Sequence, residues 1–272
     1  MLLHFDYCME IFYTEPVGRC NYTIKCIPVS NQRQRITNLK MEMLPESRPE
    51  WGYDAHGNRY IFGCNQKNHT YFKYRISGDA ECGISFSDAV TSENELMIHR
   101  HHHGLNEPGY KLKEYYEKLR ESVGILNWDS MKPLDKALYI MNKLKNDLVY
   151  EKGCTDYNTS AEEAFELGRG VCQDYSHILI SLLILSGCSA RYVTGLILGE
   201  GESHAWVEVA EDGRWYGVDP TNNVRVFDSH IRIGSGRDAR ECELNRGIMH
   251  GGGNQSQKIS VSVNKKTSFE AL

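Results

Sequence analysis

The chain has 272 residues, of which 40% are hydrophobic and 25% are charged, so it can bury one large core or two smaller ones. Its 31 Lys and Arg residues against 36 Asp and Glu residues give a formal net charge of -5. That balance excludes the basic surface of a general nucleic-acid binder. We therefore expect a globular protein with no nucleic-acid partner.

The start of the chain and its cysteines indicate a compartment. Asp6 and Glu10 interrupt the opening apolar stretch, and no basic segment precedes a long apolar run as in a signal peptide. No segment reaches membrane-spanning length. The nine cysteines are scattered, without the short paired spacings of zinc or redox sites. These features predict a cytoplasmic protein with mostly free thiols and no membrane partner.

Composition divides the chain into two parts. Residues 2–86 contain short runs rich in Tyr, Phe, Ile and Thr, separated by turn signals, which predicts an antiparallel β-rich domain over residues 1–95. Residues 96–110 are polar and are predicted to be a linker. Apolar residues at three-to-four spacing predict helices over 112–123 and 134–148, within a second domain over 111–272.

Cys172 lies where a helix is predicted to begin. Apolar residues from 171 to 183 share one helix face, and Gly187 is suited to end that helix. The unpaired N–H groups and the positive end of the helix dipole stabilise an anion, both a thiolate and the oxyanion formed when it attacks a carbonyl. The alternative is a small buried hydrophobic residue, the interpretation we give to Cys26, Cys64 and Cys188. The helix position alone does not decide between the two.

His204 and Asp219 are brought together by a predicted hairpin. Residues 203–209 alternate strictly, and Asp212-Gly213 is a strong signal for a two-residue hairpin loop. Counting back from that loop places Trp206 opposite Asp219, so His204 and Asp219 are diagonal neighbours on one face. A carboxylate there can orient the imidazole and stabilise its cation. A three-residue loop would send Asp219 to the opposite face, and His204 would then be an ordinary strand histidine.

Four segments, in this order and spacing, resemble the transglutaminase-like cysteine peptidases of microbes: GVCQDYSH at 170–177, ARYVTG at 190–195, HAWVEV at 204–209 and VDPTNN at 218–223. The resemblance runs from about Tyr150 to the end of the chain, and the β-rich first domain also resembles the one these proteins carry. It implies an α+β protein, with an N-terminal antiparallel β-domain followed by a papain-like, transglutaminase-like core. It also implies a Cys172, His204 and Asp219 triad.

The implied activity is acyl transfer on an amide bond through a thioester, without metal or organic cofactor. Cys172 attacks, His204 moves protons and Asp219 orients His204. The expected partner is a peptide, a protein or another amide-bearing substrate, handled by a peptidase, isopeptidase or amidase. A protein transamidase of the same mechanism is one alternative, and a non-catalytic binding module is another. Presence of all three triad residues favours an enzyme, whereas substrate and oligomeric state are not indicated.

Several other residues carry open interpretations. The tail resembles the family's Gly-Arg-Asp segment at Arg237 and Asp238, for which we favour a structural ion pair. Three residues nearby depart from the family, which carries Tyr, Asp and Pro there, so no substrate contact is carried over; they are Ala239, Glu241 and Leu244. Asp174, His177 and Trp206 have either supporting or packing roles.

A cluster of histidines suggests a metal site, because neutral imidazole is a common ligand. Adjacent histidines in an extended segment point to opposite sides, and no cysteine or acidic residue completes a tetrahedral set. We therefore expect a solvated linker without a metal; the cluster consists of His99, His101, His102 and His103.

Overall fold

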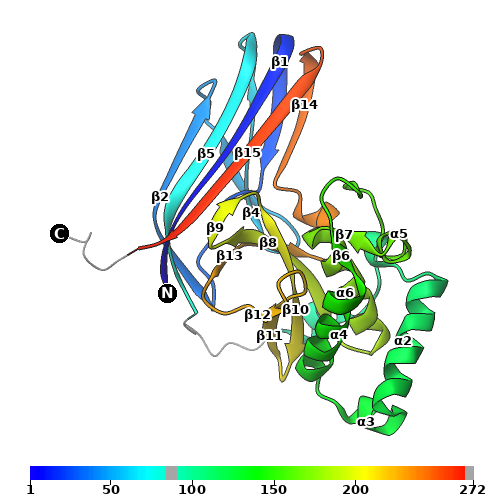
Figure 1. Cartoon of the computed structure of the whole chain (residues 1–272). Helices are drawn as coiled ribbons and strands as arrows, with labels where there is room; N and C mark the ends of the chain where they lie inside the picture. Colours follow the sequence, from blue (N-terminus) through cyan, green and yellow to red (C-terminus); the bar gives the residue numbers. More distant parts are fainter. Residues whose placement is uncertain (84–90, 267–272) are drawn as a thin grey trace.

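The fold is described from a computed structural model, which covers residues 1–83 and 91–266. A twisted sheet of long antiparallel strands rises from a body of helices packed on a second sheet (Figure 1). This is the α+β architecture predicted from the sequence. The predicted end of the β-rich run near residue 86 lies outside the described residues.

The helical elements, including two short 3-10 helices labelled η, follow the long N-terminal strands. They are α1 (Glu93–Ile98), η1 (Gly104–Asn106), α2 (Tyr110–Val123), α3 (Ile125–Ser130), α4 (Pro133–Asp147), α5 (Ala161–Leu167), α6 (Cys172–Leu185) and η2 (Ala239–Cys242). The strands are β1 (Leu2–Ile24), β2 (Gln34–Leu44), β3 (Glu50–Tyr53), β4 (Arg59–Asn65), β5 (His69–Cys82), β6 (Val149–Tyr150), β7 (Arg169–Gly170), β8 (Ala190–Ile197), β9 (Gly199–Gly201), β10 (His204–Glu211), β11 (Arg214–Asp219), β12 (Val224–Arg225), β13 (His230–Gly236), β14 (Asn245–Gly251) and β15 (Gln255–Lys265). The helices predicted over 112–123 and 134–148 are confirmed as α2 and α4.

The eight-stranded sheet is organised around β1. The first half of β1 pairs with β5 and β15, and the second half pairs with β4 and β14. Side chains alternate along the strand, so that Leu3, Phe5, Tyr7 and Met9 are buried on one face. One strand of 23 residues thereby joins two sets of partners.

The predicted boundary of the second domain, at residues 111–272, is wrong at its C-terminal end. The last strand, β15, pairs with β1 from Leu3↔Lys265 to Tyr13↔Gln255, so it belongs to the sheet begun by the N-terminal residues. Val261 and Val263 are buried in the same core as Leu3. The physical reason is that β1 has an unpaired edge that a distant strand covers, and alternation along a strand does not reveal its partner.

The second sheet has the order β12-β11-β10-β8-β13 and lies against the helices. Ala205, Val207 and Val209 face the helical side, where α6 contributes Ile178 and Leu182 to a common core. The residues between them along β10 face the other side, so this sheet carries His204 on the face opposite the α6 core. Among the described residues, no helix is long and apolar enough to cross a membrane.

The segment predicted as a linker at 96–110 is partly a buried element. His99 is only 3% exposed and Asn106 is fully buried. Asn106 donates from its side chain to the carbonyl of Arg237, and the imidazole of His99 packs edge-on against Trp215. The prediction of a solvated connection was wrong because these polar residues find their partners in distant parts of the chain.

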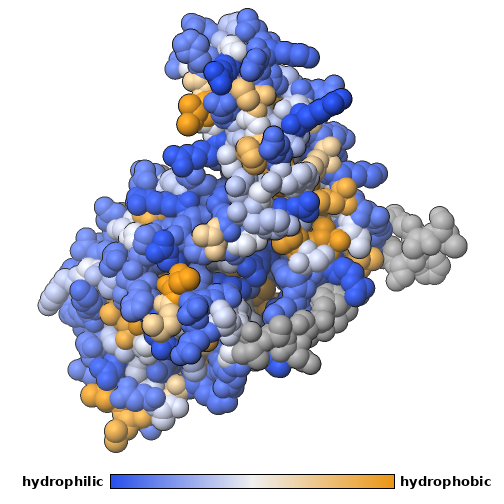
Figure 2. Space-filling model, turned by 180° about the vertical axis from the view of Figure 1, so that it is seen from behind, coloured by the Kyte–Doolittle hydropathy of each residue, from blue (hydrophilic) through white to orange (hydrophobic). Residues whose placement is uncertain are grey.

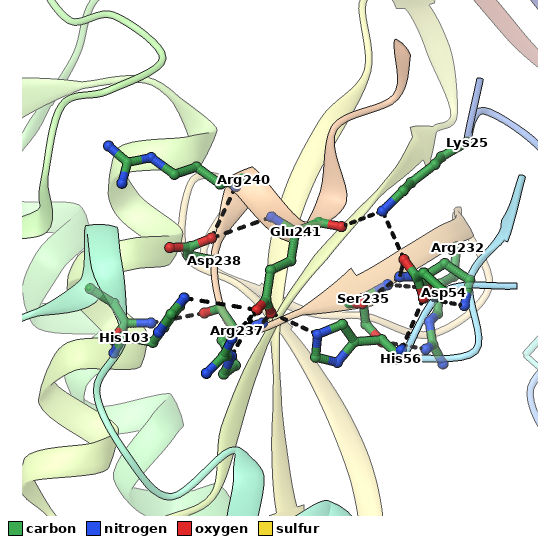
Figure 3. A network of polar contacts seen from close by, with 12 residues as sticks. Lys25, Asp54, His56, His103, Arg232, Ser235, Arg237, Asp238, Arg240 and Glu241 are labelled. Carbon is green, nitrogen blue, oxygen red and sulfur yellow. Dashed lines mark hydrogen bonds and ion pairs between the residues drawn. The ribbon is translucent and has the colours of Figure 1, made fainter. Parts of the chain in front are cut away.

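A polar network joins the two sheets, and Figure 3 shows it from close by. Glu241 lies at its centre and accepts hydrogen bonds from His56, at 2.8 Å, and from Arg237 Nε, at 2.8 Å. Lys25 binds the Asp54 carboxylate at 2.8 Å and the Glu241 carbonyl at 2.9 Å. Burial alone would raise the pKa of Glu241, but the hydrogen bonds from His56 and Arg237 hold it well below its usual range. Arg237 therefore forms an ion pair with Glu241, whereas the Asp238 carboxylate accepts hydrogen bonds from the backbone N–H groups of Leu105 and Arg240.

The surface of the described residues is mainly hydrophilic when seen from behind. Hydrophobic side chains occur there in small groups on both the narrow sheet and the wider body (Figure 2). Scattered apolar side chains of this kind are ordinary on a protein surface.

Candidate active site

Cys172 is the first residue of α6, as predicted. The helix follows a short parallel pair, in which Tyr150 of β6 lies beside Gly170 of β7, and it ends at Leu185 before Gly187 with φ of +77°. The Cys172 side chain is half-buried. The sulfur thus stands at the end of the helix where free backbone N–H groups and the positive end of the dipole stabilise negative charge.

Asp174 and His177 hold α6 in place. The Asp174 carboxylate accepts from the backbone N–H of Val171 and from the Thr155 hydroxyl, both at 2.7 Å, and burial raises its pKa. His177 accepts from the backbone N–H of Ala239 at 3.1 Å and is fully buried, which lowers its pKa to about 3. Both side chains are therefore occupied in positioning the helix start against neighbouring segments.

The hairpin of β10 and β11 has the predicted register. Its pairs run from Glu211↔Arg214 to Val207↔Val218 across the two-residue loop of Asp212 and Gly213. Both loop residues have positive φ, 49° and 71°, as a type I′ turn requires. The count that made His204 and Asp219 same-face neighbours is therefore confirmed.

His204 and Asp219 are hydrogen-bonded, with 2.8 Å between His204 Nε2 and Asp219 Oδ2. Burial alone would lower the pKa of His204, but its hydrogen bonds to Asp219 and to Cys172 raise it to about 10. Burial would raise the pKa of Asp219, but the hydrogen bonds it accepts hold that pKa well below its usual range. The imidazole is thus held as a cation between two groups that carry or can carry negative charge.

The Asp219 carboxylate has five donors around it. Oδ1 accepts from the backbone N–H groups of Thr221 and Asn222, at 3.0 and 3.2 Å. Oδ2 accepts from the Asn222 side chain at 2.8 Å, from His204, and from His230 Nε2 at 3.1 Å. Because the Asp219 side chain has no exposed surface, these donors replace water as its solvation.

His230 is the site residue that sequence reasoning missed. It lies at the start of β13, and its side chain is 1% exposed. β13 pairs with β8 and not with either strand of the hairpin, so counting along the hairpin could not place it. Within the segment from His230 to Glu241, the resemblance concerned the Gly-Arg-Asp run at Arg237 and Asp238, and it predicted no role for His230.

Trp206 packs against both imidazoles. Its ring is stacked with that of His204, with centroids 6.5 Å apart, and meets His230 edge-on with centroids 5.1 Å apart. Gly195 of β8 makes room for it, because a Cβ at this position would come within 2.4 Å of the Trp206 ring. Trp206 is 1% exposed and covers one side of the His204 and His230 rings, which keeps solvent away from that side.

A cavity of about 630 Å³ adjoins Trp206 and His230. It is lined by residues of the N-terminal region, of α1 and of the five-stranded sheet, including Arg191, Trp206 and His230. Cys172 and His204 are not among the described residues that line it. We therefore do not place a reacting amide in this cavity.

His204, Asp219 and His230 are also the described residues that could hold a metal ion, because their ligand atoms lie within 4.8 Å of one another. The same atoms make the hydrogen bonds described above, so a metal would compete with the histidine pair for Asp219. The histidine cluster at 99–103 is dispersed. His99 packs on Trp215, His102 Nε2 lies 3.0 Å from the Ser181 carbonyl, and burial lowers the pKa of His99 to about 3.

Two comparisons of sequence bear on this geometry. The family model of the transglutaminase-like superfamily matches residues 108–220, which include Cys172, His204 and Asp219. An uncharacterized protein of Mycobacterium leprae is 34% identical over 131 residues, 44% of this chain and 47% of that protein. An uncharacterized protein of Mycobacterium bovis is 32% identical over 149 residues, 48% and 47% of the two. The chain spans about half the length of these curated relatives.

One solved structure shares the fold over nearly the whole chain. It is a "Putative Cysteine Protease" from Cytophaga hutchinsonii, with a TM-score of 0.75 and 18% sequence identity over 97% of this chain and 90% of that one. At this identity the likeness bears on the fold, which includes the long-stranded sheet as well as the core. The chain therefore shares the fold of this structure, and its residues 108–220 match the transglutaminase-like superfamily.

Proposed function

We propose that the protein is an acyl-transfer enzyme that cleaves an amide bond through a thioester on Cys172, with His204 as the proton carrier and Asp219 as its orienting group. With water as the acyl acceptor the reaction is hydrolysis, and the protein is then a peptidase, isopeptidase or amidase. The observation that carries the proposal is the 2.8 Å hydrogen bond between His204 and Asp219, with Cys172 at the first residue of α6 as the neighbour that also raises the pKa of His204.

Acylation follows from the charges in that series. With the proton on His204, the Cys172 thiolate attacks the amide carbon, and the carbonyl electrons become an oxyanion beside the free N–H groups of α6. His204 then gives its proton to the amide nitrogen, the C–N bond breaks, and an amine leaves. The acyl group remains on sulfur, and His204 is neutral.

Deacylation uses the neutral imidazole as a base. His204 takes a proton from water, the hydroxide attacks the thioester carbon, and the C–S bond breaks to give a carboxylic acid and the thiolate. Asp219 keeps one carboxylate oxygen on His204 throughout, which fixes the ring orientation and stabilises each imidazolium that forms. Every proton taken is returned, so the cycle needs no further reactant.

A primary amine in place of water would make the protein a transamidase. The first half of the cycle is unchanged, and the choice depends on which nucleophile reaches the thioester first. Incubating an acyl donor with a fluorescent primary amine and following both the released acid and the labelled product distinguishes the two reactions.

The first test needs no substrate. Iodoacetamide alkylation is followed cysteine by cysteine by mass spectrometry between pH 5 and 9, in the wild type and in His204→Ala. We expect Cys172 to react faster than the exposed Cys64 at pH 6, and to lose that advantage in the variant. His250→Ala, an exposed histidine of β14, serves as the matched control.

A Cys172 that behaves like Cys64 in both proteins would contradict the proposal. It would favour a non-catalytic module of the same fold, for which a pull-down with the intact chain would be the next step. A fast Cys172 justifies screening peptides, isopeptides and other amides as substrates.

For the compartment, we propose the cytoplasm. All nine cysteines are unpaired in the structure. Cys20, Cys26, Cys82, Cys188 and Cys242 are buried as small hydrophobic side chains, whereas Cys64, which was predicted to be buried, is exposed. Cell fractionation followed by thiol counting under denaturing conditions tests this placement, and recovery with paired cysteines in an oxidising compartment would contradict it.

A further inference from the structure

One carboxylate oxygen serves two histidines. Asp219 Oδ2 accepts from His204 Nε2 at 2.8 Å and from His230 Nε2 at 3.1 Å. The mechanism proposed above uses only the first of these hydrogen bonds. The second involves a side chain that is 1% exposed, so it exists in a place from which water is excluded.

The protonation of His230 follows from its neighbours. An ionised carboxylate only accepts hydrogen bonds, so His230 Nε2 must carry a proton. On its other side, His230 Nδ1 lies 3.0 Å from the Ser229 hydroxyl, which can donate to it. A neutral imidazole with its proton on Nε2 satisfies both contacts, and Ser229 then selects that tautomer.

The position of the ring is set by packing as well. His230 starts β13, which is separated by β8 and β10 from β11, the strand that ends at Asp219, so the two side chains meet at the ends of their strands. Trp206 lies edge-on to the ring at 5.1 Å, and Gly195 leaves the space in β8 that Trp206 occupies. A side chain confined in this way can hold a hydrogen bond in one direction.

We propose that His230 is a positioning residue for the reaction at Cys172, because it donates to Asp219 and thereby keeps the carboxylate ionised and turned toward His204. This inference rests on the proposed function. The series then extends from Ser229 through His230, Asp219 and His204 to Cys172.

The physical effect is on the shared proton between Asp219 and His204. His230 is a third donor on Oδ2, beside His204 and the Asn222 side chain. It adds to the stabilisation of the negative charge and makes the carboxylate a poorer acceptor of a proton, so the proton stays on His204. The low pKa of Asp219 owes part of its direction to His230, after the contribution of His204. Without that donor, Oδ2 would keep His204 and the Asn222 side chain as its partners, and the buried charge of Asp219 would be less stabilised and less firmly held toward His204.

The experiment compares His230→Gln with His230→Phe. The amide nitrogen of Gln can donate from about the place of the imidazole Nε2, whereas Phe fills the space without a donor. For each protein, the rate of Cys172 alkylation by iodoacetamide is measured from pH 5 to 9, and thermal unfolding is measured in parallel. We expect the Phe variant to lose about 10- to 100-fold in rate at pH 6 and to approach the wild type at pH 9.

His230→Gln should retain most of the wild-type rate at pH 6, which a merely structural role would not predict for a variant of equal thermal stability. Equal rates for Phe, Gln and wild type, or equal losses in Phe and Gln, would overturn the inference. If wild-type Cys172 itself shows no advantage over Cys64, the proposed function fails before His230 is at issue.

A second variant covers the case in which His230→Phe does not fold. Ser229→Ala leaves all groups around Asp219 in place and removes only the hydroxyl next to His230 Nδ1. We expect about a three- to tenfold loss of the alkylation rate at pH 6, because the His230 ring loses a hydrogen bond that helps to hold it against Asp219. A wild-type profile in Ser229→Ala together with a misfolded Phe variant would count against the proposal.

Discussion

The two sheets differ in how far apart along the chain their paired strands lie. In the five-stranded sheet, β8, β10 and β11 are close in sequence and adjacent in space. In the eight-stranded sheet, β1 pairs with β15, so that Leu3 lies opposite Lys265 (Figure 1). One sheet is built from neighbouring segments, and the other is closed by the two ends of the described chain.

The region built from neighbouring segments carries the proposed catalytic residues, whereas the long sheet mainly supports the fold. The proposed catalytic residues lie on α6 and on one hairpin, where short connections fix the geometry. The long sheet depends on pairing between distant segments, which is slow to form and is stabilised mainly by the side chains it buries. We therefore expect substitution of the nucleophile to alter reactivity at constant stability, and substitutions in the buried core of the long sheet to do the reverse.

The largest expected effect is that of Cys172→Ala. Removing the nucleophile should lower the rate of amide cleavage by about 10⁴-fold or more, because only binding and the helix N–H groups remain. Urea unfolding should stay close to wild type, since the side chain is half-buried and small. The measurement is turnover of an amide substrate found by screening, with Cys154→Ala as a control from a neighbouring loop. Activity retained in Cys172→Ala would show that Cys172 is not the nucleophile of the reaction.

The opposite result is expected for Val263→Asp in β15. Val263 is fully buried against the N-terminal strands, so an aspartate there is an unpaired buried charge and should cost on the order of 3–5 kcal/mol. Ser260→Asp places the same charge at an exposed position of the same strand. Urea unfolding followed by circular dichroism should separate the two variants. In the fraction that remains folded, Cys172 should keep its alkylation rate at pH 6. If Val263→Asp lowers both the stability and the alkylation rate of the folded fraction, the long sheet also contributes to the reactivity of Cys172.

The features that could be predicted from the sequence are those formed by residues close together in the chain. The start of α6 and the register of the β10–β11 hairpin were predictable, because capping, periodicity and a two-residue loop act over a few residues. The placement of β15, the burial of His99 and the contact of His230 with Asp219 were not. Each depends on which distant strand or helix becomes a neighbour, and neither composition nor alternation encodes that choice.

The third prediction concerns pH and the His204–Asp219 pair. The pKa of His204 is raised from 6.5 to about 10, so its contribution to stability is fully present below about pH 6.5. The contribution declines above that pH, because the unfolded chain has released the proton, and it is lost at about pH 10. The free energy of unfolding of the wild type should therefore exceed that of His204→Gln by a margin that shrinks between pH 7 and 10. A margin that stays constant over this range would show that His204 is not held as a cation.

The smallest expected effect is that of a substitution in the polar network around Glu241, which joins the two sheets (Figure 3). Glu241→Gln keeps the shape of the side chain but removes the charge that His56 and Arg237 share, and should cost about 1–3 kcal/mol at pH 7. Glu15→Gln, at an exposed position of β1, is the matched control, and both are measured by urea unfolding.

The pH dependence of this variant identifies the cause of its loss. The pKa of Glu241 is held below its usual value, so the ion pairs contribute stability above about pH 4.3 and lose it as the pH falls below that value. The difference between wild type and Glu241→Gln should consequently shrink in acid, while Cys172 alkylation at pH 6 stays unchanged in both. A difference that does not shrink between pH 5 and about pH 2 would assign the loss to altered packing. A slower Cys172 would mean that this polar network also positions the residues of the candidate active site.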